Sequence, residues 1–220
     1  MNYLLLFISV ICGYLIGSIP SALIIGKTFF HKDIRDYGSH NLGGTNAGRV
    51  LGHKAGIIVI LLDILKIIIA MLIVYFIALM FKVINLNPYI LVTALLAVIG
   101  HCYPLYCGFK GGKAVSVIVG FLLITNYLLF VIWVIIFFFV LYLKRMVSLS
   151  SMLTSLIVAL LSFIPFFSNT MLFLVTYDIY YCIVLLLLSI ILIIRHIPNI
   201  KRLLNHTESK IKWMDRKKSE

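Results

Sequence analysis

Three polar segments interrupt a chain that is otherwise strongly apolar: Asp33–Arg49, Gly100–Lys113 and Arg195–Lys210. Each segment combines cationic side chains with small residues and neutral hydrogen-bonding groups, and the first two contain only two acids, Asp33 and Asp36. Glycines allow backbone N–H groups to converge on a bound oxyanion, and cations neutralise its charge. If the three segments meet in the folded protein, they are suited to bind phosphate groups.

The second segment ends in the sequence FKGGK, Phe109–Lys113, and leads directly into an apolar run that begins at Ala114. We therefore expect these glycines and lysines at the N-terminus of a helix, a position that favours anions. The alternative is an ordinary loop whose lysines only set the orientation of the chain in a membrane. Because three such segments occur, we favour the phosphate site.

His196 is the histidine most suggestive of chemistry, because Arg195 precedes it and Asn199 follows three residues later. An imidazole titrates near neutral pH and is a candidate general base. If the last apolar helix continues through this region, His196 and Asn199 share a face, although Pro198 makes that turn irregular. Ser148–Ser151 are expected to cap a helix, with a hydroxyl contribution to the same pocket as the alternative.

Asp63 and Lys66 lie three residues apart within an apolar run, so they are expected on one face of a helix. They form either a mutually neutralising pair that packs against another helix or the floor of a polar pocket. Charges inside a membrane are costly and usually functional, and the sequence leaves both interpretations open.

Nucleotide and metal sites are disfavoured. Ser21–Thr28, SALIIGKT, has a serine where a P-loop has its first glycine, and no strand precedes it. The four cysteines are scattered, so we expect no disulfide framework and no zinc site. The sequence therefore predicts neither a metal nor another cofactor.

The composition defines the elements that must position these residues. Of the 220 residues, 63% are hydrophobic and only 12% are charged, which is more apolar surface than a soluble domain of this length can bury. Runs such as Tyr3–Ile25 and Gly56–Phe81 are long enough to cross a bilayer. We predict an all-α integral membrane protein with a single domain, residues 1–220. The net charge of +12 suggests membrane orientation here, and not nucleic acid.

The distribution of Lys and Arg predicts seven transmembrane helices, with the N-terminus outside and the C-terminus in the cytoplasm. All cations except Lys66 and Lys82 then face the cytoplasm, as do the loops 27–54, 100–113 and 195–220. The fallback is five spans with the same sidedness. The expected spans are 3–25, 55–81, 88–99, two within 114–143 that turn at 125–126, and two within 148–194 that turn at 165–169.

Four ordered motifs resemble the bacterial acyl-phosphate-dependent glycerol-3-phosphate acyltransferases, the PlsY family. They are GSIPSALIIGK (Gly17–Lys27), DIRDYGSHNLGGTNAGR (Asp33–Arg49), GHCYPLYCGFKGGKAVS (Gly100–Ser116) and RHIPNIKRLLNHTE (Arg195–Glu208). The resemblance covers nearly the whole chain, with the motifs in the expected order and spacing. Any one of them alone would be a weak signal.

The resemblance implies transfer of a fatty acyl group from acyl phosphate to the 1-hydroxyl of glycerol 3-phosphate. The expected products are lysophosphatidic acid and phosphate, and no cofactor is required. It also implies a multi-pass protein of the bacterial cell membrane whose active site faces the cytoplasm. The expected partners are the two substrates, membrane lipid and, functionally, an enzyme that forms acyl phosphate, with no nucleic acid.

Ser39, His196 and Asn199 are the catalytic positions implied by the resemblance. The implied substrate-binding positions are Asn41, Thr45, Asn46, Arg49, His101, Lys110, Gly111, Gly112, Lys113, Ser151 and Arg195. The chain departs from the family pattern at His40 and His206, which both replace glycines, and at Gly44, where alanine is common. Bulk at His40 is expected to alter the loop, but we still expect activity.

Acyl phosphate is an activated anhydride, so no covalent enzyme intermediate is needed. Either His196 or a phosphate oxygen of the donor accepts the hydroxyl proton, and the second is preferred. The alternative functions are a transporter or channel for a small organic anion, and a scaffold subunit of a lipid-synthesis complex. A transporter usually needs access from both faces and often contains an internal repeat, whereas here the polar segments crowd one face.

Overall fold

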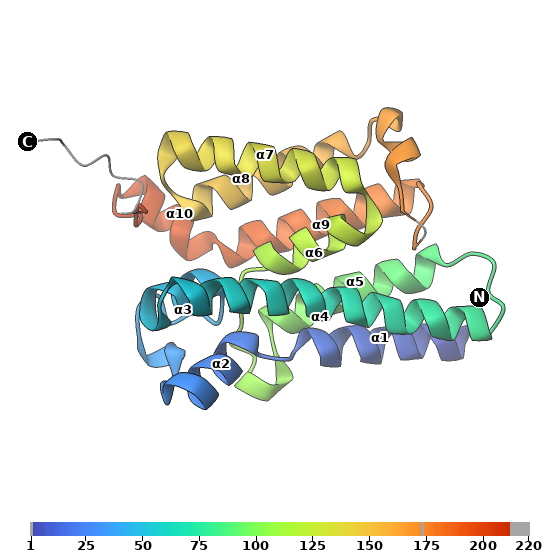
Figure 1. Cartoon of the computed structure of the whole chain (residues 1–220). Coiled ribbons are helices and arrows are strands. Elements are labelled where there is room, and N and C mark those ends of the chain that lie inside the picture. Colours follow the sequence, from blue (N-terminus) through green and yellow to red (C-terminus); the bar gives the residue numbers. More distant parts are fainter. Residues whose placement is uncertain (1, 173, 212–220) are drawn as a thin grey trace, which may run out of the picture.

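The computed structural model describes residues 2–172 and 174–211, and helices dominate these ranges. Two groups of helices lie side by side (Figure 1). The first group contains α1 (Tyr3–Gly17), α2 (Ser21–Phe30), α3 (Gly44–Leu51), α4 (His53–Met80) and α5 (Asn87–Cys102). The second contains α6 (Val115–Thr125), α7 (Tyr127–Lys144), α8 (Val147–Leu161), α9 (Ile179–Arg195) and α10 (Ile197–Leu204). Short 3-10 helices occupy Ile34–Asp36, Leu105–Cys107 and Pro165–Thr170. Helix α6 contacts α4, α5 and α7, and so joins the two groups.

The first apolar run, which supplies the predicted span Tyr3–Ile25, is not one continuous helix. Helix α1 ends at Gly17 and α2 begins at Ser21, with Pro20 at the cap position between them. Proline cannot donate a backbone hydrogen bond and interrupts a helix. Gly17 packs so closely on α5 that an added Cβ would collide with the backbone of Ala97. This break gives the site an irregular segment of backbone at its edge.

The predicted turn at Thr125–Asn126 is confirmed, because α6 ends at Thr125 and α7 begins at Tyr127. The buried Asn126 side chain accepts hydrogen bonds from the backbone N–H of Leu129 and the hydroxyl of Thr170. Its amide nitrogen donates to the carbonyl oxygen of Phe167 at 3.0 Å. One asparagine therefore caps α7 and fixes the connection between α8 and α9. That connection runs over 162–178, longer than the predicted turn at 165–169.

Length and apolar composition identify four helical segments that can cross a membrane within the described residues. A fifth is obtained if α9 and α10, which meet at an angle of 57°, are taken as one broken span. Helices α6 and α8 are apolar but shorter, with 11 and 15 residues. Only 17% of the α7 span is buried inside the protein, so its large apolar side chains, such as Phe138 and Phe139, are placed to face lipid.

Candidate active site

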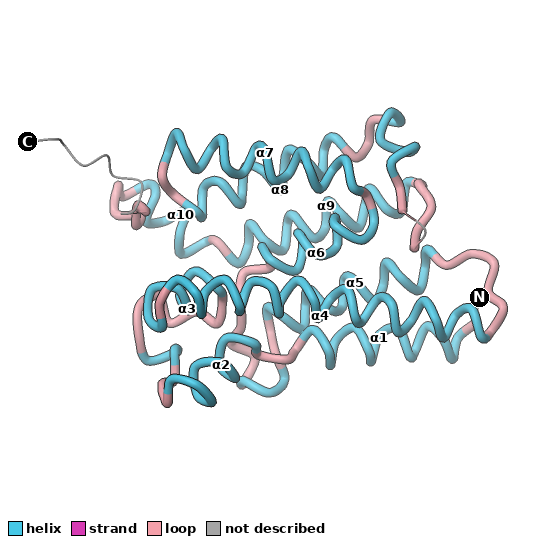
Figure 2. The backbone as a smooth tube through the Cα atoms, in the orientation of Figure 1, coloured by secondary structure: helices cyan, strands magenta, loops and turns pink. Residues whose placement is uncertain are grey.

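The three polar segments converge at the end of the molecule that carries α2, α3 and α10, opposite the N-terminus (Figure 2). The Asn41 amide donates to the carbonyl oxygen of Gly111 at 3.2 Å, which joins the first segment to the second. The Arg195 guanidinium donates to the carbonyl oxygens of Gly111 and Gly112 at 3.2 and 3.1 Å. Lys113 Nζ donates to Asn199 Oδ1 at 2.6 Å. These contacts bring residues from all three polar segments into one site.

Asn46 builds the first loop. Its Oδ1 accepts the backbone N–H of Ser39 at 2.8 Å, and its Nδ2 donates to the carbonyl oxygens of Ile34 and Tyr37. The side chain is buried and its amide is engaged by the loop itself, so it shapes the backbone around Ser39. Ser39 is exposed on this loop.

Helix α3 begins at Gly44 and carries Thr45 and Arg49, four residues apart on one exposed face. Both side chains therefore point away from the core at the end of the bundle where the three segments meet. Their positions suit contact with a ligand more than contact with the core.

His40, where the resemblance expects glycine, has a φ of 56°, in the left-handed region that favours glycine. Its Nδ1 lies 2.6 Å from the carbonyl oxygen of Arg35, so this ring nitrogen donates the hydrogen bond. Nearby, the Arg35 guanidinium pairs with Asp33 and holds the pKa of that carboxyl well below its usual range. His40 therefore adopts the backbone conformation that favours glycine, and its ring forms a hydrogen bond within the loop.

The glycine pair of the second segment serves close packing. An added Cβ at Gly112 would collide with the imidazole ring of His101, and one at Gly111 would collide with the carbonyl oxygen of His101. The N–H of Gly112 donates to that same carbonyl oxygen at 2.9 Å, so it is not free for an anion as the sequence suggested. Helix α6 begins at Val115, shortly after Lys113, as expected. Lys110 is exposed.

A chain of hydrogen bonds links the second segment to the third. Asn199 accepts from Lys113 and donates through Nδ2 to Glu208 Oε1 at 2.7 Å. The same carboxylate accepts from Ser148 Oγ and, through Oε2, from Arg202 Nε, both at 2.7 Å. Glu208 therefore fixes the orientation of Asn199, and Asn199 fixes that of Lys113.

The serines of α8 do not cap the helix as expected, because the cap position is Met146. Ser150 Oγ and Ser151 Oγ donate back to the carbonyl oxygens of Met146 and Val147 in their own helix. Ser148 instead binds Glu208, so one hydroxyl of this group does take part in the site, which was the alternative interpretation.

His196 lies at the bend between α9 and α10. The last helix is therefore not continuous through this region, which was the condition for His196 and Asn199 to share a helix face. The two residues are nonetheless adjacent, because the backbone N–H of Asn199 donates to the carbonyl oxygen of His196 at 2.8 Å. The His196 ring is 3% exposed and its Nδ1 lies 2.8 Å from the carbonyl oxygen of Leu192. A carbonyl only accepts, so Nδ1 carries the proton and Nε2 of the neutral ring keeps its lone pair.

Cations dominate the electrostatics of this site. Burial lowers the pKa of Lys113 to about 8, and the guanidinium groups of Arg202, Arg195 and Arg49 act in the same direction while Glu208 opposes them. Burial disfavours the charged form of Glu208 as well, but its hydrogen bonds outweigh this effect and lower its pKa. One carboxylate neutralises only part of the charge of four cations, so the site is suited to a phosphate group.

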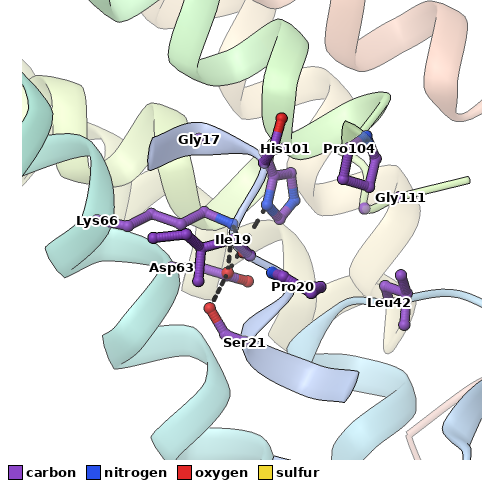
Figure 3. A pocket seen from close by; sticks show the side chains of 12 residues that line it. Gly17, Ile19, Pro20, Ser21, Leu42, Asp63, Lys66, His101, Pro104 and Gly111 are labelled. Carbon is purple, nitrogen blue, oxygen red and sulfur yellow. Dashed lines mark hydrogen bonds and ion pairs between the residues drawn. The ribbon is translucent and has the colours of Figure 1, made fainter. Parts of the chain in front are cut away.

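The Asp63–Lys66 pair forms as the spacing predicted, with Lys66 Nζ 3.0 Å from Asp63 Oδ1. Figure 3 shows Lys66, His101 and Ser21 directed toward this carboxylate. A small cleft opens beside it, bounded by the α1–α2 break, Leu42, His101 and the glycine pair. Both interpretations of the pair thus hold in part, since the two charges neutralise each other and also line a polar cleft.

The sequence did not single out Ser21, Ser116 or Arg202 as members of the site. Ser21 and Ser116 both donate to Asp63, and Arg202 binds Glu208. Arg202 and Glu208 are six residues apart, outside the spacing at which helical side chains meet. Only the turn after α10 brings them together. Ser21 and Ser116 lie on other helices than Asp63, so no sequence signal links them to this carboxylate before the helix packing is known.

The fold and the site together define a multi-pass helical membrane protein with a cluster of cations at one end of the bundle. The chain belongs to the glycerol-3-phosphate acyltransferase family, whose model matches residues 7–206.

A glycerol-3-phosphate acyltransferase of Bacillus subtilis is 46% identical over 212 residues, which cover 96% of this chain and 100% of the relative. The enzyme of Staphylococcus haemolyticus is 43% identical over 217 residues, with coverage of 96% and 100%.

Two crystal structures of PlsY (YgiH), described as an integral membrane glycerol 3-phosphate acyltransferase, share the fold. The glycerol 3-phosphate form has a TM-score of 0.80 and 31% identity, and covers 94% of this chain and 95% of that chain. The lysophosphatidic acid form has a TM-score of 0.78 and 30% identity, with the same coverage. The predicted family, the all-α integral membrane class and the multi-pass character are thereby confirmed.

Proposed function

We propose that the protein transfers a fatty acyl group from acyl phosphate to the 1-hydroxyl of glycerol 3-phosphate, and so forms lysophosphatidic acid and inorganic phosphate. The observation that carries this proposal is the site around Lys113, whose half-buried ammonium is held by Asn199 and lies near the guanidinium groups of Arg202, Arg195 and Arg49. Such a cluster is stabilised by a bound phosphate group. The similar crystal structures, in glycerol 3-phosphate and lysophosphatidic acid forms, support the acceptor and the product.

The reaction exchanges an anhydride bond for an ester bond. The 1-hydroxyl oxygen bonds to the acyl carbonyl carbon, the bond from that carbon to the phosphate oxygen breaks, and phosphate leaves with the electron pair. The hydroxyl proton passes to an oxygen of the departing phosphate, so the donor itself supplies the base. His196 Nε2, which retains a lone pair, is suited to accept a hydrogen bond from the glycerol 3-phosphate molecule and so to orient it, while the proton of the reacting hydroxyl goes to the phosphate.

The remaining residues contact the reacting groups, position another side chain or bind phosphate. Ser39 is exposed on the first loop and is suited to contact the reacting groups, while Asn199 is held between Lys113 and Glu208 and positions the amine. Holding two reactants in attack geometry can lower a barrier by roughly 7–11 kcal/mol. The side chains that we assign to phosphate binding or to the walls around it are Asn41, Thr45, Asn46, Arg49, His101, Lys110, Lys113, Ser151 and Arg195, with the backbone of Gly111 and Gly112.

We propose seven membrane crossings in the bacterial cell membrane, with α6 and α8 as short crossings that neighbouring helices cover. The N-terminus then lies outside, and the loops 27–54, 100–113 and 195–220 lie on the cytoplasmic side of a single domain. The N-terminus and the polar segments lie at opposite ends of the bundle, which supports this orientation (Figure 1). A Ser39→Cys variant should react with an impermeant thiol reagent only when the cytoplasmic face is open.

The direct test uses the purified protein with palmitoyl phosphate and labelled glycerol 3-phosphate, and palmitoyl-CoA as the control donor. Labelled lysophosphatidic acid from the first donor alone is the expected result. Product from palmitoyl-CoA alone would overturn the choice of donor, and no product from either would overturn acyl transfer. Because acyl phosphate is a reactive anhydride, the protein depends in the cell on an enzyme that forms it.

A further inference from the structure

Asp63 and Lys66 are buried charges that the proposed reaction does not use. Their residues are only 1% and 6% exposed, and both lie on α4 beneath the glycine pair and not among the cations around Lys113. Taking two charges out of water is costly, and packing alone is served equally well by apolar side chains of similar size. The contacts of the pair indicate what it does.

The Asp63 carboxylate receives groups from three other helices. Ser21 Oγ of α2 donates at 2.8 Å, Ser116 Oγ of α6 donates at 3.3 Å, and His101 Nδ1 of α5 lies 3.7 Å away. Lys66 Nζ pairs with the carboxylate and donates to the carbonyl oxygen of Ile19 at 2.9 Å, within the break between α1 and α2. One ion pair thus fixes four helices and the interruption of the first apolar run.

The path from Asp63 to the phosphate site is short. The His101 ring, held beside Asp63, forms the wall against which Gly112 packs, and the carbonyl oxygen of His101 accepts the Gly112 N–H. The carbonyl oxygen of Gly112 accepts a hydrogen bond from Arg195 Nε, and the next residue along the chain is Lys113. The placement of both cations therefore depends on the position of the His101 ring.

We propose that the Asp63–Lys66 pair positions the phosphate-binding loop through His101. Asp63 and Lys66 are positioning residues that touch no substrate. The carboxylate accepts hydrogen bonds from the two hydroxyls and provides the polar surface against which the imidazole lies at 3.7 Å. The ammonium neutralises the carboxylate and ties it to the α1–α2 break. This inference rests on the proposed function of the site, because its readout is the use of glycerol 3-phosphate.

The test compares Asp63→Asn, Lys66→Met and the double variant, purified in detergent, by KM for glycerol 3-phosphate and by melting temperature. A change in the folded fraction lowers the apparent kcat but leaves KM unchanged, so KM separates positioning from stability. Each single variant should melt earlier, because one buried charge is left unpaired. Each should also raise KM on the order of tenfold, as when one hydrogen bond to a charged group is lost.

The double variant carries no unpaired charge, so its melting temperature should recover toward that of the wild type. Its KM should stay raised, because the introduced amide and thioether cannot hold the ring and the break as the ion pair does. Recovery of KM together with stability would show a purely structural pair and overturn the inference, as would unchanged KM in both single variants. Non-additive effects of Asp63→Asn and His101→Asn on KM are expected if the first acts through the second.

Asn87→Ala is the matched control. Asn87 is also buried, lies at the opposite end of α5 from His101, and binds Thr176 and Asp178. It should melt earlier with KM unchanged. An inactive wild type with palmitoyl phosphate would overturn the proposed function and the inference together, whereas an active wild type with unaffected variants would overturn the inference alone.

Discussion

His206 occupies a backbone position that is built for glycine. Helix α10 ends at Leu204, and the N–H of His206 donates to the carbonyl oxygen of Leu203 while the N–H of Thr207 donates to that of Arg202. This pair of bonds is the Schellman motif, in which the first residue beyond the cap is left-handed and usually glycine. His206 has a φ of 56°, as the motif requires. The strain of a Cβ in this conformation is about 1–2 kcal/mol.

We predict that His206→Gly stabilises the protein. The gain from relieved strain is partly offset by the greater backbone freedom of glycine in the unfolded chain, about 0.5–1 kcal/mol, so the net gain is on the order of 0.5–1 kcal/mol. For a chain of this size that gain raises the melting temperature by roughly 1–4 °C. Acyltransferase activity should persist, since the turn continues to deliver Glu208 to Asn199.

The assay is thermal unfolding of the purified protein in one detergent, with His206→Ala as the matched control. Alanine removes the imidazole but keeps the Cβ, so it should leave the strain and the melting temperature nearly unchanged. A glycine variant that melts no later than the alanine variant would refute the assignment of the strain to the left-handed backbone.

Four further outcomes are expected. His40→Gly relieves strain at a similar φ but loses the hydrogen bond to the carbonyl oxygen of Arg35, so its melting temperature should rise less than that of His206→Gly. An equal rise in melting temperature would contradict this balance. The KM for glycerol 3-phosphate should rise as pH exceeds about 8, where Lys113 loses its proton and charge, and Lys113→Arg should remove that rise from a pH series. In steady-state kinetics, Arg49→Ala should mainly raise KM for glycerol 3-phosphate. His196→Ala should retain measurable turnover. Complete loss of turnover in His196→Ala with substrate binding intact would make His196 the base.

The convergence of the three polar segments could be predicted, because charge and glycine content are visible in the sequence without knowledge of helix packing. The turn at Asn126 was equally accessible, since Lys113 and Lys144 flank 30 uncharged residues, 114–143, and lie on the same side of a membrane only if the chain turns between them. The break before Ser21 was missed although Pro20 was visible, because hydropathy alone was used to define the first span.

The local roles of the site residues were harder to predict, because they depend on contacts between distant parts of the chain. Gly111 and Gly112 were assigned to anion binding through their N–H groups, but their lack of a side chain is needed against His101. Asn46 was expected to bind substrate, and the structure shows that its amide engages three backbone groups of its own loop. No spacing rule distinguishes an amide that binds a ligand from one that shapes the loop that does so.

The two histidines in place of glycines show how the family pattern and the structure complement each other. Resemblance alone marked His40 and His206 as departures from a family pattern, without a physical reason for the pattern. The structure supplies that reason, because both residues have φ of 56°. His40 lies between Ser39 and Asn41, and His206 lies two residues before Glu208. A left-handed residue at these points turns the chain so that the next polar side chains face the site, and both histidines adopt this turn at the cost of backbone strain.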